Sequence, residues 1–239
     1  MHSRPLLIGF VGISGSGKTT IANAVTAALK AIKHDVLVLN EESYCKPLSQ
    51  PKKGENERCP YDVSSAIDKV NLLHDLKQLK EGKSITCKRS MHSTSAEESK
   101  AILLTPAKIV IVEGIFLLQD ENIRNLFDKI FFVDTKLDIA MSRRLKRDEK
   151  IEHTNSQYLD RYETLVRPDA LVVQELKKYA DVILKNNMEA ESKASISEAY
   201  DSILGMEIQN SVHAHGLFVS HKVMDMFPST GGRLLRSRL

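Results

Sequence analysis

Residues 12–19 read Gly12-Ile13-Ser14-Gly15-Ser16-Gly17-Lys18-Thr19 and match the pattern G-x-x-x-x-G-K-[ST] at every fixed position. The apolar run Leu6–Val11 stands directly before this stretch, and a segment with apolar residues at three- and four-residue steps follows it. The glycines let successive backbone N–H groups face a phosphate, and the N-terminus of the following helix adds its positive dipole. The stretch therefore predicts a phosphate-binding loop.

The fixed positions of this loop carry separate chemical tasks. Lys18 is expected to reach the β- and γ-phosphates of a nucleotide, and the Thr19 hydroxyl is expected to ligate Mg²⁺. We therefore expect ATP and Mg²⁺ as cofactors. The predicted nucleotide contacts are Gly12, Ile13, Ser14, Gly15, Ser16, Gly17, Lys18, Thr19 and Thr20, together with Arg143 from a later helix.

Four further apolar runs are short and largely continuous, as expected of strands that are covered on both faces. Segments with helical periodicity lie between them. This alternation predicts an α/β fold with a parallel sheet, in which ligands collect beyond the carboxyl ends of the strands. The runs span 36–39, 109–112, 130–133 and 182–184, and the clearest helical segments span 21–32 and 67–79.

Charge and composition exclude several classes of function. Lys plus Arg number 34 against 31 for Asp plus Glu, and no long run of one sign occurs, so a nucleic-acid partner is not expected. No apolar stretch approaches the roughly 18 residues of a membrane span, so no membrane partner is expected. The absence of a signal-peptide pattern predicts a cytoplasmic protein. The final Ser237-Arg238-Leu239 is a basic variant of a peroxisomal tripeptide or a frayed basic terminus.

Two carboxylates follow predicted strands. The run 109–112 ends in Glu113, which is well placed to hold the metal or its water shell, although a Glu that only caps the next segment would look the same. Glu42 follows the second strand and is our candidate for the base that accepts the proton of an attacking hydroxyl, with a role beside the metal. A solvated acidic loop is the alternative for Glu42.

The helix predicted over Leu137–Asp148 carries three arginines that a mobile lid, over about 143–156, could bring to the phosphates. Arg143 is placed among the nucleotide contacts, and Arg144 and Arg147 among the catalytic residues together with Lys18 and Glu42. A solvated basic helix face is the alternative. Asp-x-x-Gly and Asn-Lys-x-Asp motifs are missing at the places where GTPases have them, which favours a kinase.

Two polar stretches, 41–61 and 83–99, do not fit the alternation and are interpreted as surface loops or small insertions beside the site. After about residue 186 the pattern weakens to one helix over 195–206 and a tail rich in Gly, Ser and Arg. We therefore predict a P-loop kinase domain over 1–186 and a C-terminal helix with an accessory tail over 187–239.

From about Leu6 to Leu184 the chain resembles the uridine/cytidine kinase family and its near relatives, the nicotinamide riboside kinases. The order and spacing of several motifs carry this resemblance beyond the phosphate loop. They are Glu42-Ser43-Tyr44 where the family has Asp-Ser-Phe, Tyr61-Asp62, Val112-Glu113-Gly114-Ile115, Phe132-Val133-Asp134-Thr135, 142–148, Val166-Arg167-Pro168 and 177–183.

The resemblance implies a P-loop NTPase three-layer sandwich of the nucleoside-monophosphate-kinase-like type, with a five-stranded parallel sheet. It implies ATP-dependent phosphorylation of a nucleoside to its 5′-monophosphate, and it allows a homo-oligomer. Glu42 stands at the family's catalytic Asp, and Arg144 and Arg147 match its lid arginines. The implied substrate contacts are Asp62, which stands where the family binds ribose hydroxyls, with Tyr61, His92 and Arg144.

The departures from the family concern the acceptor. Cys87-Lys88 stands where uridine kinases have a Tyr-Asp pair that reads the base, and only His92-Ser93 remains of the following His-Ser-Arg. The acceptor is therefore open between a nucleoside and another small molecule, such as nicotinamide riboside, pantothenate or a sugar acid. The change from Asp to Glu at position 42 also leaves open a nucleotide-binding regulator with impaired catalysis.

Overall fold

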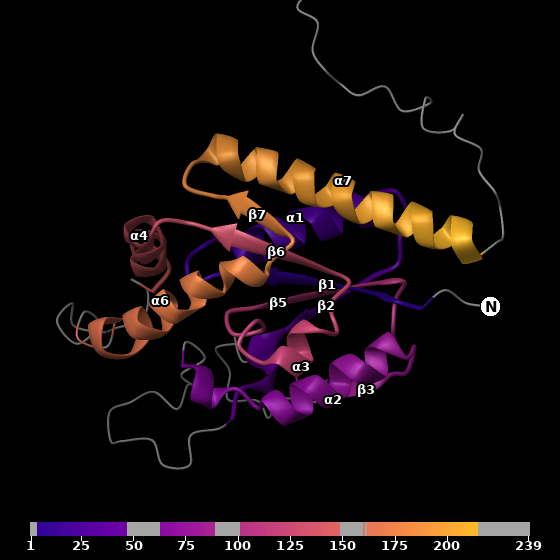
Figure 1. Ribbon diagram of the computed structural model, residues 1–239, viewed down its shortest axis with the longest axis horizontal. Coiled ribbons are helices and arrows are strands. Elements are labelled where there is room, and N and C mark those ends of the chain that lie inside the picture. The colour runs from indigo at the N-terminus through magenta and orange to yellow at the C-terminus, as the bar shows by residue number, and fades with distance from the viewer. Residues whose placement is uncertain (1–3, 47–62, 89–100, 149–159, 161, 215–239) are drawn as a thin grey trace, which may run out of the picture.

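A computed structural model describes residues 4–46, 63–88, 101–148, 160 and 162–214. Its centre is a sheet of five parallel strands in the order β2-β5-β1-β6-β7 (Figure 1). This confirms the predicted α/β sandwich with a five-stranded parallel sheet. The strands are β1 (Leu6–Val11), β2 (Val36–Asn40), β5 (Ile109–Gly114), β6 (Lys129–Asp134) and β7 (Val182–Lys185).

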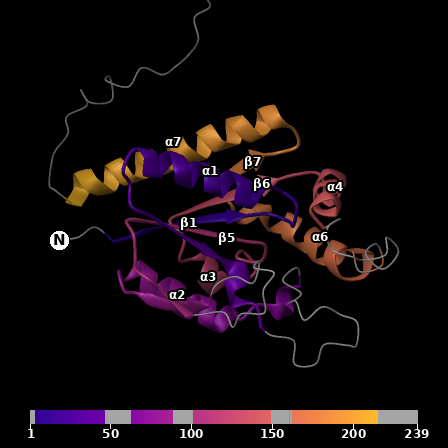
Figure 2. The same cartoon turned by 180° about the vertical axis from the view of Figure 1, so that it is seen from behind.

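Helices cover both faces of this sheet. In the two opposite views α1 (Lys18–Ala31) and α7 (Glu189–Ala214) lie on one side of it, and α2 (Lys69–Lys80) and α3 (Glu121–Arg124) lie on the other (Figures 1 and 2). Because side chains alternate between the faces of a strand, both faces of β1 are apolar. Leu7 belongs to the core beneath α2, and Ile8 belongs to the core beneath α1.

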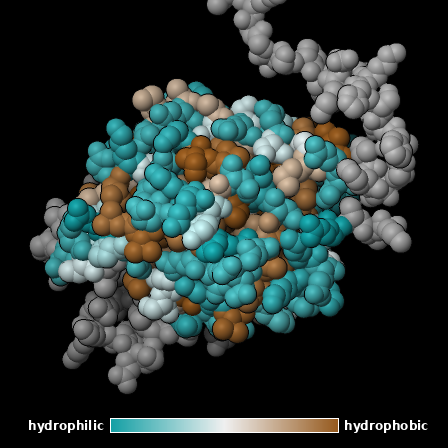
Figure 3. All heavy atoms as spheres, viewed as in Figure 1, coloured by the Kyte–Doolittle hydropathy of each residue, from teal (hydrophilic) through white to brown (hydrophobic). Residues whose placement is uncertain are grey.

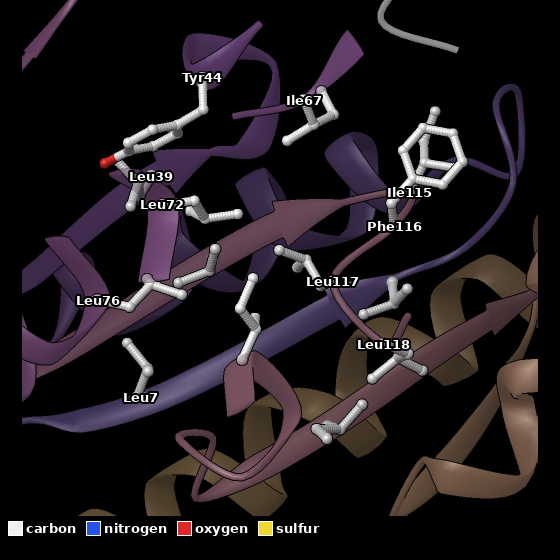
Figure 4. Packing of buried hydrophobic residues seen from close by; sticks show 14 of the residues in the cluster. Leu7, Leu39, Tyr44, Ile67, Leu72, Leu76, Ile115, Phe116, Leu117 and Leu118 are labelled. Atoms are coloured by element: carbon white, nitrogen blue, oxygen red, sulfur yellow. The ribbon is translucent and has the colours of Figure 1, made fainter. Parts of the chain in front are cut away.

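The α2 side of the core closes around the segment that follows β5. Leu72 and Leu76 of α2 and Leu7 of β1 are fully buried in one cluster with residues 115–118 and Tyr44 (Figure 4). Tyr44 ends the short 3-10 helix η1 (Glu41–Tyr44), so this packing fixes the turn that follows β2. The core therefore supports the carboxyl ends of the strands, where the sequence places the site.

The C-terminal helix is longer than predicted. The sequence indicates a helix over 195–206, whereas α7 spans Glu189–Ala214 and packs against α1. In the middle of α7, Ala199 and Ile203 are buried at 0% exposure in the core beneath α1, so the apolar pattern marks this part of the helix. Acidic residues in the first turn favour its N-terminal extension through the helix dipole.

One of the two polar stretches contains a short strand. The stretch 83–99 was interpreted as a surface loop or small insertion, and within it β3 (Ile85–Lys88) pairs with β4 (Ala101–Leu104) in an antiparallel hairpin apart from the main sheet. Ile85 and Cys87 are buried while Thr86 is exposed, which is the alternation of a half-buried strand. Four residues are too few for this alternation to stand out in a polar stretch.

Four further helical elements are α4 (Leu137–Asp148), the π-helix η3 (Tyr162–Val166), α6 (Arg167–Glu175) and η4 (Leu176–Tyr179). In Figure 1 α4 lies beyond the end of β6, while α6 buries Ala170 and Val173 in the same core as α2. The face seen in Figure 3 is mostly hydrophilic, with hydrophobic residues in small separated groups. Within the described ranges no helix is long and apolar enough to cross a bilayer.

Candidate functional site

The phosphate loop joins β1 to α1 at the carboxyl edge of the sheet. Gly15 and Gly17 have φ angles of 81° and 91°, a left-handed conformation that other residues rarely adopt. A Cβ on Gly15 would also collide with the carbonyl of Ala140 at the start of α4. Lys18 begins α1 and is only 8% exposed. The residues of the motif thus adopt the predicted strand, loop and helix in succession.

Two of the predicted metal-side residues, Thr19 at the start of α1 and Glu113 in β5, are in contact. The Thr19 hydroxyl donates to Glu113 Oε2 at 2.5 Å, and the Asn40 side-chain amide donates to Glu113 Oε1 at 3.1 Å. Asn40 Oδ1 in turn accepts the backbone N–H of Glu42 at 2.9 Å. A hydroxyl and a carboxylate at the helix end of a phosphate loop are the oxygen ligands that Mg²⁺ prefers. Thr19 and Glu113 therefore fit a magnesium site.

Glu42 lies in η1, directly beyond the end of β2 and partly buried. Through Asn40 its backbone is tied to Glu113, so the two carboxylates that the sequence places after different strands belong to one edge of the sheet. This arrangement follows from the pairing of β2 with β5, in which Asn40 is opposite Glu113. The register of these strands brings the candidate base to the metal side of the loop.

Glu41 is the neighbour that the sequence did not single out. Its carboxylate is 3% exposed and accepts the backbone N–H groups of Ile115 and Phe116 at 2.7 and 2.9 Å. Burial raises the pKa of Glu41 to about 7, although these two hydrogen bonds and the nearby Lys18 and Lys69 favour its charged form. Glu41 thus fastens the end of β2 to the chain that leaves β5.

Arg143 and Arg144, two of the predicted lid arginines, contact the loop. Arg144 is 6% exposed and donates to the Ser14 hydroxyl at 3.1 Å, and Arg143 donates to the Ser16 carbonyl at 3.4 Å. Arg147 lies about one turn further along α4 and is exposed. The helix therefore directs Arg143 and Arg144 toward the nucleotide loop.

Two adjoining hollows lie beside η1 and share Lys46 and Asp68 in their walls. The larger measures about 510 Å³ and also reaches Lys69, and the smaller measures about 360 Å³ and reaches Tyr44 and Cys87. The walls of both hollows include residues that lie close to Glu42 in the sequence.

Several predicted contacts lie outside the described residues. Tyr61, Asp62 and His92 of the expected acceptor site belong to this group, as do the later part of the lid after residue 148 and the terminal Ser237-Arg238-Leu239. Their expected roles stay predictions.

Sequence reasoning also missed three polar side chains that hold the site together. Asn40 connects Glu42 with Glu113, and Thr135 and Asn186 both donate to the carbonyl of Ser16. Each follows or ends a strand of the parallel sheet, at the same edge as the motif. Their position at strand ends is the one signal in the sequence that could have identified them.

The fold and the site together define a P-loop kinase. The sequence profile of the Phosphoribulokinase / Uridine kinase family matches residues 7–192, and the chain belongs to this family. The uridine kinase of Macrococcus caseolyticus is 34% identical over 184 residues, which cover 76% of this chain and 88% of that protein. The uridine kinase of Tolumonas auensis is 36% identical over 183 residues, covering 75% and 86%.

Solved structures agree on the fold. A candidate fructose transport system kinase from Silicibacter sp. TM1040 superposes with a TM-score of 0.61 at 17% identity, over 76% of this chain and 90% of that one. A possible uridine kinase from Bacillus stearothermophilus superposes with a TM-score of 0.51 at 23% identity, over 77% and 90%. At these identities the likeness concerns the fold alone.

Proposed function

We propose that this chain transfers the γ-phosphoryl group of ATP to a hydroxyl of a nucleoside and releases ADP and a nucleoside monophosphate. The observation that carries the proposal is the meeting of the phosphate loop, the Thr19–Glu113 pair and the Glu42 turn at one edge of the sheet. The uridine kinase relatives, at 34 to 36% identity over three quarters of the chain, support the nucleoside as acceptor.

On the nucleotide side, the loop N–H groups and the dipole of α1 would hold the phosphates, with Lys18 on the β- and γ-phosphates. Thr19 and Glu113 would hold Mg²⁺, with Glu42 beside them. Bound Mg²⁺ supplies positive charge that offsets the negative charge on the phosphate oxygens during transfer.

On the acceptor side, Glu42 is the proposed base. The acceptor hydroxyl oxygen forms a bond to the γ-phosphorus, the bond between that phosphorus and the bridging oxygen to the β-phosphate breaks, and Glu42 takes the hydroxyl proton. Asn40 fixes the backbone of Glu42 through its side-chain oxygen, so the carboxylate is attached to a turn whose position is set by β2. Asp62 is the proposed partner of the ribose hydroxyls, with Tyr61 and His92 as further acceptor contacts.

The arginines of α4 are proposed to act on the transferring group. Arg144 and Arg147 would neutralise charge as it spreads over the γ-phosphoryl oxygens, and Arg143 would support the nucleotide. The near-complete burial of Arg144 beside Ser14 supports this role, because a guanidinium in a poorly hydrated position interacts more strongly with an anion than one in bulk water. Closure of the segment after α4 would remove water from the phosphates.

A second acceptor class is favoured by one observation. Cys87, a small and buried side chain, lines the hollow of about 360 Å³ at the position where uridine kinases have a tyrosine that reads the base. Tyr44 lines the same hollow and donates its O–H to Asp75 at 2.8 Å. A different ring or chain could fill this space, so nicotinamide riboside, pantothenate and sugar acids are the alternative acceptors.

A panel of acceptors tests the proposal. Labelled ATP with Mg²⁺ is offered uridine, cytidine, nicotinamide riboside, pantothenate and gluconate in turn, and phosphorylated product is measured. Uridine or cytidine is expected to give the highest kcat/KM. Efficient transfer to another member alone would reassign the acceptor. ATP binding without transfer to any acceptor would support the impaired nucleotide-binding regulator.

A further inference from the structure

The carbonyl oxygen of Ser16, inside the phosphate loop, is held by donors from three separate elements. Thr135, directly after β6, shares its hydroxyl proton between this carbonyl at 3.0 Å and the Asn186 carbonyl at 3.2 Å, and Asn186, directly after β7, donates its side-chain N–H at 2.6 Å. Arg143 of α4 adds a longer contact at 3.4 Å. Thr135 and Asn186 are 1% and 4% exposed, so water competes little for these hydrogen bonds.

This carbonyl controls a neighbouring N–H group. In a planar trans peptide the C=O and the following N–H point in opposite directions. Donors that fix the Ser16 carbonyl on the side of β6 and β7 therefore turn the Gly17 N–H toward the opposite side of the peptide. An N–H of the loop binds a phosphate only when it faces the phosphate. The orientation of this one peptide thus affects how well the loop binds a nucleotide.

Asn186 also fits the unusual conformation of Gly17. Gly17 has a φ of 91°, and the side-chain nitrogen of Asn186 occupies the space where a Cβ on Gly17 would lie. A side chain at position 17 would displace Asn186 and strain the backbone. Gly17 and Asn186 therefore fit each other in space although 169 positions separate them in the sequence.

We propose that Asn186 is a positioning residue for the nucleotide. It acts through the Ser16 carbonyl, with Thr135 as its companion, and keeps the Ser16–Gly17 peptide in the orientation that binds phosphate. The proposal rests on nucleotide binding by the phosphate loop and is independent of which acceptor receives the phosphoryl group. By this proposal, the residue that follows β7 helps to bind the nucleotide.

The next residue supplies a matched control. Asn187 Oδ1 accepts the backbone N–H of Lys136 at 2.9 Å, and the Asn187 N–H groups donate to Glu191 at 2.6 and 3.0 Å. Asn187 thus holds the same turn to the start of α4 and the start of α7, with no hydrogen bond to the phosphate loop among its described contacts. Loss of Asn187 loosens the turn, whereas loss of Asn186 frees the loop peptide.

The test compares nucleotide affinity, measured by titration calorimetry with MgADP, in the wild type, Asn186→Asp and Asn187→Ala. Asn186→Asp keeps the shape but places an ionised oxygen against the Ser16 carbonyl, and we expect affinity to fall about tenfold or more. Lowering the pH should recover part of this loss relative to the wild type, because a protonated carboxyl can donate. Asn187→Ala should stay within about twofold of the wild type.

Two further measurements separate positioning from general damage. Thr135→Val removes the second donor while keeping the shape, and it should weaken MgADP binding in the same direction with the far-UV circular dichroism unchanged. With an active acceptor, the KM for ATP should rise in Asn186→Asp while the KM for the acceptor at saturating ATP is unchanged. Equal affinity in Asn186→Asp and the wild type, or an equal loss in Asn187→Ala, would overturn the proposal.

Discussion

Replacement of Glu41 by Gln should change how the stability of this protein depends on pH. Glu41 is buried beneath the chain that leaves β5, and burial raises its pKa from 4.5 to about 7. At pH below about 4.5 the carboxyl is protonated in both the folded and the unfolded chain. As the pH rises toward 7 the unfolded chain releases this proton while the folded chain keeps it, so the folded state becomes relatively less stable.

The size of this effect follows from the shift. A pKa difference of about 2.5 units at about 1.4 kcal/mol per unit corresponds to about 3.5 kcal/mol of folding stability, which is fully lost once the pH exceeds about 7. Gln keeps an oxygen that can accept the N–H groups of Ile115 and Phe116 but has no proton to release. Between pH 4.5 and pH 8 the free energy of unfolding of the variant should therefore rise relative to that of the wild type by up to about 3.5 kcal/mol.

Urea unfolding at a series of pH values measures this difference. The control is Glu198→Gln on α7, whose side chain is exposed, and its curve should run parallel to that of the wild type. All other titrating groups are common to the wild type and Glu41→Gln, so only Glu41 separates these two curves. Parallel curves for Glu41→Gln and the wild type would refute the reasoning that burial governs this carboxyl.

Three other substitutions test separate parts of the structure. Gly15→Ala places a Cβ against the Ala140 carbonyl and forces a left-handed φ on Ala. The affinity for MgADP, measured by calorimetry, should therefore fall at least about tenfold. An unchanged affinity would contradict the loop geometry. Ile203→Ala opens a cavity between α7 and the core beneath α1 and should lower the free energy of unfolding by about 2–5 kcal/mol in urea, whereas a loss below about 1 kcal/mol would show that α7 is not firmly packed. Arg144→Ala should lower kcat about 100-fold or more in steady-state assays, and Lys146→Ala on the exposed side of α4 serves as its control; equal rates in the two variants would remove Arg144 from the transfer step.

Much of the fold could be predicted because its signals are local. The five apolar runs mark the strands of the sheet to within two residues at each end, and the motif 12–19 requires a strand before it and a helix after it. The parallel order brings the strand ends to one edge, which is why Thr19 and Glu113 could be associated before their contact was known.

Elements with weak or split patterns could not be predicted. The β3–β4 hairpin has four residues in each strand, and the two strands are separated by a polar stretch, so neither shows enough alternation. The ends of α7 lie beyond the positions that face α1 and therefore carry no apolar period. In both cases tertiary pairing decides a structure that the local sequence leaves undecided.

The contacts inside the site depend on register, which the sequence does not show. Glu41 and Glu42 are adjacent and identical, and only the fold shows that Glu41 is buried against the segment after β5 while Glu42 is tied to Asn40. Asn186 reaches Ser16 because β6 and β7 end level with the loop. A single sequence identifies the loop but not the distant side chains that orient it.

The most direct measurement of the central claim is transfer of labelled γ-phosphate from ATP to uridine or cytidine by the wild type and by Glu42→Gln. The control is Glu198→Gln, far from the site on α7. The wild type and the control should form nucleoside monophosphate at equal rates, and Glu42→Gln should be slower by about 100-fold or more, a loss larger than any loss of MgADP affinity. Equal rates in Glu42→Gln and the wild type, or no phosphorylated nucleoside from the wild type, would contradict the account.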